Sequence, residues 1–122
     1  MSLDSAASGL ATASYINAVL AHYLQLPDSP LRTSLADQRL ARQLLDRGVP
    51  LTTVEAALLL GSLRRLARPE DLPPLQPIRS LAYFMPLVDE LLAQPLPDRY
   101  VDYLKLKLAR FASAMVQKDT LS

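Results

Sequence analysis

The sequence predicts an all-α fold, a compact bundle of about five helices that forms one domain. Apolar residues recur at spacings of three and four in successive segments, and no stretch alternates convincingly with a period of two. The ten prolines lie mainly between the periodic segments, where they end helices. A chain of 122 residues, 50% of them apolar, is long enough to bury a core without metals or disulfides.

The first helix is predicted in the segment YINAVLAHYLQL. Residues 1–10 before it are small and polar, which predicts a loose N-terminal tail. The helix is expected to end before Pro27, because proline disrupts a helix interior. Its apolar stripe consists of Ile16, Val19, Leu20, Tyr23 and Leu24. This stripe is expected to face the core.

The second helix is predicted from about Ser34 to Arg47. Thr33 or Ser34 can cap its N-terminus, and Asp37 lies in the first turn, where the helix dipole favours an anion. Gly48 follows as the expected left-handed residue just past the end of the helix.

The third helix is predicted in TVEAALLLGSLRRLAR and is expected to stop before Pro69. Thr52 and Glu55 form a T-x-x-E pattern, which predicts a capping box at its start. Residues 58–60 are consecutive leucines, as expected of a helix surrounded by neighbours. We therefore expect this helix to be the central one, forming an antiparallel pair with the second helix.

A proline-rich connector, RPEDLPPLQP, separates the third and fourth helices and is expected to be stiff and extended. The segment IRSLAYFMPLVDELLA then has a helical apolar stripe with Pro86 inside it. Pro86 either kinks this helix or lies in the first turn of a new helix that follows a short turn over residues 78–84. The sequence leaves both alternatives open.

The last helix is predicted to begin after Asp98, a good N-cap residue. Its core stripe consists of Val101, Leu104, Leu108, Phe111 and Met115. Residues 11–118 are therefore expected to form a single helical domain, with residues 119–122 as a C-terminal tail.

The stretch RGVPLTTVEAALLLGSLRR also raises the alternative of a DNA-reading helix-turn-helix. Gly48, Val49 and Val54 fit the turn and the apolar positions after it. Leu44, however, is bulky where the two helices of that motif approach closely, and Glu55 would be repelled by phosphates. The central helix of a bundle is the favoured interpretation.

Charge is unevenly distributed although the net charge is only +1. Basic residues predominate over residues 29–69 and again over residues 99–118, and acidic residues predominate over residues 70–98 between them. If the last helix packs beside the end of the third, six cations would form one basic face suited to phosphate contact. These cations are Arg64, Arg65, Arg68, Lys105, Lys107 and Arg110. The alternative is that they pair with the acidic segment or are simply solvated.

Membrane and disulfide-dependent classes are not indicated. The chain has no cysteine, and its N-terminus lacks the basic and apolar regions of a signal peptide. The longest apolar run, residues 56–60, is far shorter than the ~20 residues of a membrane helix. We therefore expect a soluble cytoplasmic protein with no membrane partner.

No catalytic, metal or cofactor site is predicted. His22 is the single histidine, and no carboxylate stands at a helical neighbour position to orient it. The adjacent carboxylates Glu70–Asp71 and Asp89–Glu90 diverge on a helix instead of converging on a substrate. The sequence also lacks a phosphate-binding loop, a dinucleotide-binding glycine pattern and a nucleophile elbow. We expect a protein that is not an enzyme.

Residues 35–95 resemble, in layout, the helical modules of bacterial replication-initiation and primosomal proteins of the DnaD-like type. The resemblance rests on the helix pair joined through RGVPLTTVEAAL, the connector, and a helix opened by IRSLAYF. DnaD-like modules carry a Y-x-x-x-I-x-x-x-W motif linked to DNA contact, and Tyr83, Leu87 and Leu91 occupy comparable spacing here, with Pro86 between them. The chain is also similar to short bacterial accessory proteins of mobile elements.

The leading hypothesis is a helical accessory protein that binds nucleic acid through the basic face, in replication or in mobile-element function. Its affinity would come from neutralising phosphates, not from reading bases. The rival is a protein-interaction module, either a homodimer or a subunit of a larger assembly. It is motivated by Tyr103, Leu106 and Ala114, which lie outside the core stripe of the last helix. A third hypothesis is an enzyme subunit whose active site another chain completes.

Overall fold

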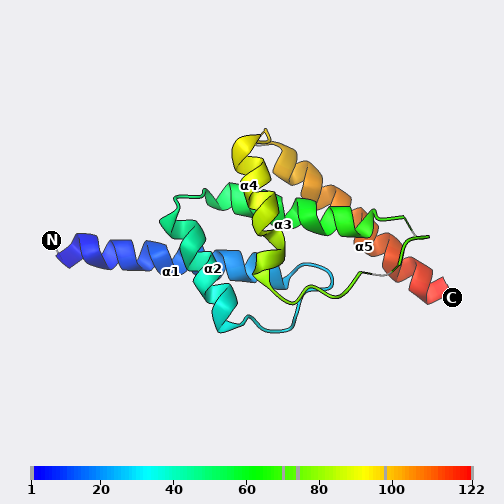
Figure 1. Ribbon diagram of the computed structural model, residues 1–122, viewed down its shortest axis with the longest axis horizontal. Helices are drawn as coiled ribbons and strands as arrows, with labels where there is room; N and C mark the ends of the chain where they lie inside the picture. The colour runs from blue at the N-terminus through cyan, green and yellow to red at the C-terminus, as the bar shows by residue number, and fades with distance from the viewer. Residues whose placement is uncertain (1, 70, 74, 98, 122) are drawn as a thin grey trace.

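The computed structural model describes residues 2–69, 71–73, 75–97 and 99–121, which form helices and connecting segments without a strand (Figure 1). The elements are α1 (Ser2–Leu24), α2 (Leu35–Asp46), α3 (Leu51–Leu66), the 3-10 helix η1 (Leu81–Phe84), α4 (Met85–Ala93) and α5 (Arg99–Leu121). The predicted all-α bundle with five α-helices is confirmed. None of the described helices has the length and hydropathy needed to cross a membrane.

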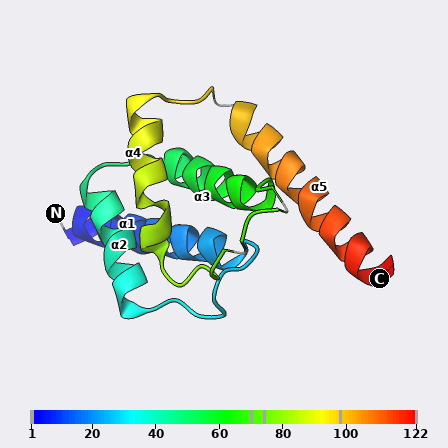
Figure 2. The ribbon, with the colours of Figure 1, turned by 45° about the vertical axis from the view of Figure 1, so that its right-hand side comes forward.

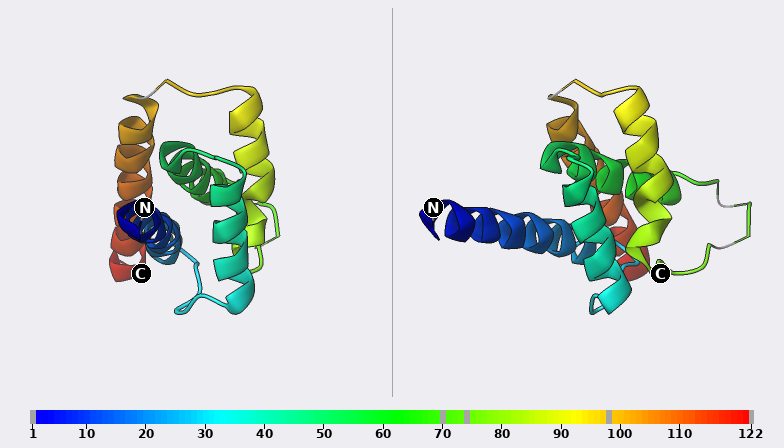
Figure 3. Two further views of the ribbon diagram at one scale, coloured as in Figure 1. Left: turned by 90° about the vertical axis from the view of Figure 1, so that its left-hand side faces the viewer. Right: turned by 60° about the vertical axis from the view of Figure 1, so that its left-hand side comes forward.

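Helix α3 is the centre of the bundle, as predicted. Viewed along its axis in Figure 3, it has α1 and α5 on one side and α2 and α4 on the other. It packs against α1, α4, α5 and η1. Of its own residues only Thr52 and Arg64 are exposed to solvent. Leu58, by contrast, is almost fully buried, with 1% of its surface accessible. A helix buried on this many sides has no free face to place in a DNA groove.

Helix α2 is capped at both ends by the residues that the sequence indicates. The Ser34 hydroxyl accepts from the Asp37 amide at 3.1 Å, and the Asp37 carboxylate accepts from the Ser34 amide at 3.0 Å. This is a reciprocal capping box. At the other end Gly48 has a φ of +71°, and the Val49 amide donates to the Leu44 carbonyl at 3.0 Å. That six-residue closure is a Schellman motif, which requires a residue tolerant of positive φ.

The junction between α2 and α3 differs from the prediction in two respects. Helix α2 packs against α1 and η1 and crosses α3 steeply, so the expected antiparallel pair is not formed (Figures 2 and 3). The predicted Thr52–Glu55 capping box is also wrong, because α3 begins at Leu51 with Pro50 as an N-cap that makes no side-chain hydrogen bond. The Schellman turn followed by Pro50, with its fixed φ, redirects the chain and starts the helix early.

The buried Asp37 connects α2 to η1 as well as capping α2. Its Oδ1 accepts from the Leu81 amide at 2.9 Å, and the carboxylate is 1% exposed. Ser80 then caps η1, its hydroxyl accepting from the Ala82 amide. Pro86 lies in the first turn of α4 directly after η1, which confirms the second of the two predicted alternatives for this proline.

Both terminal helices extend past the body of the bundle (Figures 1 and 2). Helix α1 begins at Ser2, so the backbone is helical where the sequence predicts a loose tail over residues 1–10. Alanine, which has the highest helix propensity, occurs repeatedly in this stretch. Helix α5 continues to Leu121, beyond residue 118, where the domain was expected to end. The predicted N-cap Asp98 lies outside the described residues.

Candidate functional site

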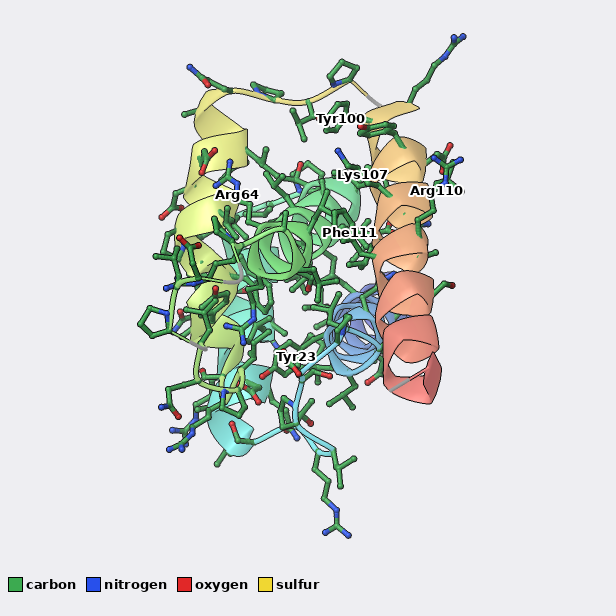
Figure 4. All side chains as sticks on the ribbon, turned by 90° about the vertical axis from the view of Figure 1, so that its right-hand side faces the viewer. Tyr23, Arg64, Tyr100, Lys107, Arg110 and Phe111 are labelled. Atoms are coloured by element: carbon green, nitrogen blue, oxygen red, sulfur yellow. The ribbon has the colours of Figure 1, made fainter. Side chains whose placement is uncertain are left out.

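The six cations of the predicted basic face lie in four different places. Arg64 of α3 points toward α4, where it pairs with both carboxylate oxygens of Glu90 at 2.8 and 3.1 Å (Figure 4). The hydrogen bond from Arg64 lowers the pKa of Glu90, and the same bond raises the pKa of Arg64. Arg64 is therefore engaged in holding α4 against α3.

Arg65 and Arg68 lie near the C-terminal end of α3. The Arg65 side chain is only 7% exposed, donates to the Gln76 carbonyl at 2.8 Å and lies 3.6 Å from the Asp28 carboxylate. Its guanidinium also lies 5.2 Å from the centre of the Tyr83 ring. The Nε of Arg68 is buried and has no hydrogen-bond partner in the described part of the chain. Arg65 thus ties the connector to α3 and is not free to contact phosphate.

Lys105 lies at the opposite end of α3 from these arginines. Its ammonium is 2.7 Å from the carboxylate of Glu55, whose side chain is 14% exposed. Pairing with Glu55 raises the pKa of Lys105. The pair borders two hollows of about 470 and 360 Å³. It links α5 to α3, with the start of α5 beside the start of α3.

Lys107 and Arg110 of α5 are the two predicted cations that remain exposed without an acidic partner among the described residues. Arg110 lies on the side of α5 that points away from α3, far from Arg64 (Figure 4). Lys107 donates to the Tyr103 hydroxyl at 3.3 Å, and its ammonium lies 5.6 Å from the centre of that ring. The structure therefore brings Lys107 and Arg110 together but places the other four cations elsewhere.

Helix α5 carries exposed apolar side chains outside its buried stripe. Leu104 and Leu108 face the core and are 1% and 9% exposed. Outside this stripe Tyr100, Tyr103 and Leu106 are 38%, 48% and 53% exposed. We call these three residues, with Lys107 and Arg110, the outer face of α5.

The outer face of α5 has a defined shape. The rings of Tyr100 and Tyr103 are 5.2 Å apart at 45°. A hollow of about 320 Å³ is lined by Tyr103, Leu106, Lys107, Arg110 and Phe111. Its walls are mainly apolar and its rim carries the two cations, a combination typical of a surface that receives another molecule.

Part of this face was predicted from the sequence. Tyr103 and Leu106 are exposed, as expected from their position outside the core stripe, and the side chain of Ala114 lies outside the described residues. Sequence reasoning did not include Tyr100 in the second face of this helix, although it stands three residues before Tyr103.

His22 lines the hollow of about 360 Å³ beside the Lys105–Glu55 pair. This hollow lies between α1, α3 and α5, and its lining includes Leu58, Leu59 and Leu108. The histidine is half-buried. Within the described residues no cluster of three or more histidine, aspartate or glutamate side chains could hold a metal ion. The carboxylate of Glu55 in this hollow is paired with Lys105, which leaves His22 without an obvious acid to orient it.

The residues behind the DnaD-like resemblance are divided between surface and core. Tyr83 is 44% exposed and packs edge-on against Phe84, whereas Leu91 is 5% exposed and belongs to the core. Leu87 is half-buried, close to Gly61 of α3. No family model, curated protein or solved structure gives a significant match to this chain.

Proposed function

We propose that this chain is a non-enzymatic protein-interaction module that docks another protein on the outer face of α5. One observation carries the proposal: Tyr100, Tyr103 and Leu106 are exposed together on a helix whose core stripe is already buried against α3. Aromatic residues and arginine are the residues most enriched in binding hot spots, and this face holds two tyrosines beside Arg110.

The apolar surface that these three residues expose indicates a binding site of modest affinity. Fully burying a large apolar side chain is worth roughly 1.5–3 kcal/mol, and these three begin about half buried, so covering them contributes roughly 2–4 kcal/mol. Association itself costs more than this. A stable complex therefore needs further contacts, from the cations or from a partner that extends beyond these residues.

Nucleic acid is less well supported as the ligand. Arg64, Arg65 and Lys105 are engaged by groups within the chain. Leu106, one of the most exposed residues of the outer face of α5, has no favourable contact to offer a phosphate. A setting in replication or mobile-element function rests only on the resemblance of layout.

The proposal is tested by placing a photo-crosslinking amino acid at Leu106 in cells that naturally contain the protein. A matched control places it at Leu31, which is 96% exposed and lies in the loop before α2. A specific protein adduct at position 106, identified by mass spectrometry and absent at position 31, is the expected result. Equal labelling at both positions, or none at 106, would show that this face does not dock a protein.

Self-association is distinguished in the same experiment. An adduct of the chain with itself would identify the partner as a second copy, and light scattering should then show a mass that rises with concentration. An adduct with a different protein identifies a heterologous complex.

A further inference from the structure

We infer that the occupant of the outer face of α5 is an acidic amphipathic helix of another protein, an inference that rests on the proposed interaction function. Three observations point to it: the spacing of the face's residues along α5, its unpaired positive charge, and the internal pairing of three exposed acids of this chain.

The shape of the face matches a helix. From Tyr100 to Arg110 its residues recur at three and four positions, a stripe ~15 Å long at 1.5 Å per residue. A partner helix that packs along such a stripe presents apolar side chains at i, i+3 or i+4, and i+7. The hollow beside Tyr103 and Leu106 offers a place for one of these side chains.

The charge of the face favours an acidic partner. Arg99 stands exposed at one end of the stripe, and Lys107 with Arg110 at the other, none with a carboxylate partner in the described residues. The Lys107 ammonium contacts only the Tyr103 side chain. The nearest acid on this helix, Asp102, acts on Lys105, which belongs to the α3 side. Docking an acidic helix would supply the missing partners, and complementary charge also speeds association.

A second copy of this chain fits the face poorly. Of the exposed acids whose side chains the structure describes on its helices, Asp46, Asp89 and Glu90 are already paired, with Arg42, Arg47 and Arg64. The fourth, Asp102, lies on α5 itself, where its charge raises the pKa of Lys105. A parallel pairing of two outer faces of α5 would bring Lys107 and Arg110 of both copies together, and like charges in an interface are unfavourable. A heterologous acidic helix satisfies the cations without breaking these internal pairs.

The inference is tested with the full-length protein and three fluorescent probes. The first is a synthetic amphipathic helix with leucines at i, i+3 and i+7 flanked by glutamates, the second carries lysine in place of every glutamate, and the third is a single-stranded oligonucleotide of similar length. Anisotropy is measured for the natural protein and for two double variants, Lys107→Glu/Arg110→Glu and the control Arg32→Glu/Arg39→Glu. All four positions are exposed, and circular dichroism checks that each variant folds.

We expect the acidic helix to bind and the basic helix to bind at least tenfold more weakly. The Lys107→Glu/Arg110→Glu variant should lose about tenfold or more in affinity, while the control variant changes less than about threefold. Equal binding of the two helices, no binding of the acidic helix, equal losses in both variants, or tighter binding of the oligonucleotide would each overturn the inference. A Leu106 adduct to a partner segment that is not acidic would also overturn it and leave the proposed docking function standing.

Discussion

Asp37 is a buried residue that hydrogen-bonds two separate segments of the backbone. Its two carboxylate oxygens accept from backbone amides of different segments, Ser34 before α2 and Leu81 at the start of η1. The second bond is buried and spans from α2 to the segment that positions α4. One side chain thus caps the start of α2 and holds the start of η1.

Replacing Asp37 by Ala should lower the free energy of unfolding by about 2–4 kcal/mol. About 1 kcal/mol comes from the lost cap, and about 1–3 kcal/mol from leaving the buried Leu81 amide without an acceptor. Urea denaturation followed by circular dichroism measures the change. The matched control is Asp46→Ala, which removes an exposed carboxylate from the same helix and should cost less than about 1 kcal/mol. Equal losses in the two variants would contradict this role for Asp37.

Tyr23 makes the stability sensitive to alkaline pH. It is fully buried against Phe84, and burial, with a smaller effect of the Asp37 charge, raises its pKa to about 12. The folded state therefore holds the phenol proton more tightly than the unfolded chain, whose tyrosine pKa is about 10. This contribution to stability is fully present below pH 10 and is lost as the pH rises toward 12.

The free energy of unfolding should accordingly fall by up to about 3 kcal/mol between pH 10 and pH 12 because of Tyr23. Denaturation at a series of pH values measures the slope. Tyr23→Phe should make it shallower, and Tyr100→Phe, at an exposed site, should leave it as it is. A slope that is the same in the natural protein and in Tyr23→Phe would contradict the assignment.

At the scale of elements, the contact between α3 and α4 depends on a residue with no side chain. A Cβ on Gly61 would lie 2.6 Å from the Leu87 side chain and 2.7 Å from the Phe84 ring. Such distances are well inside van der Waals contact, so the helices cannot keep their separation if Gly61 is enlarged. Ion pairs from α4 to Arg47 and Arg64 hold the same helix from its exposed side.

Gly61→Ala should therefore destabilise the protein by about 1–3 kcal/mol, although alanine is favoured over glycine in a helix by about 1 kcal/mol. Thermal denaturation measures the loss. The same change in a Leu87→Ala background should cost less, because the nearest clashing side chain is shortened. If Gly61→Ala instead stabilised the protein, the helices could accommodate the added methyl group without loss of packing, which would contradict this prediction.

At the scale of the whole molecule, the dispersal of the cations limits the number of phosphates that one nucleic-acid ligand could contact. A contact through Arg99, Lys107 and Arg110 alone releases about three counterions, so log K against log salt on duplex DNA should have a slope no steeper than about −3. Six convergent cations would give about −5. Fluorescence anisotropy at several salt concentrations measures this slope. Arg64→Ala should leave it unchanged, and a slope near −5 that falls in this variant would restore the single basic face.

The sequence predicts the elements well because their signals are local. Ser34 and Gly48 act on backbone groups within a few residues, so the limits of α2 can be read without knowledge of the rest. The direction of α3 after Pro50 depends on packing against four other elements, which no local pattern encodes. Predicting whether the six cations form one basic face required knowing how α5 is aligned along α3. Leu104 and Leu108 pack into the core, and Lys105 pairs with Glu55 at the start of α3, not at its arginine-bearing end.

The position of two tyrosines on the outer face of α5 also has a spectroscopic consequence. The chain has no tryptophan and five tyrosines, so its near-ultraviolet emission comes from tyrosine, and two of the five emitters stand on this face. A partner that covers Tyr100 and Tyr103 shields them from a dissolved quencher such as acrylamide, while the fully buried Tyr23 is shielded already. The protein therefore carries its own optical reporter of occupancy, without any label.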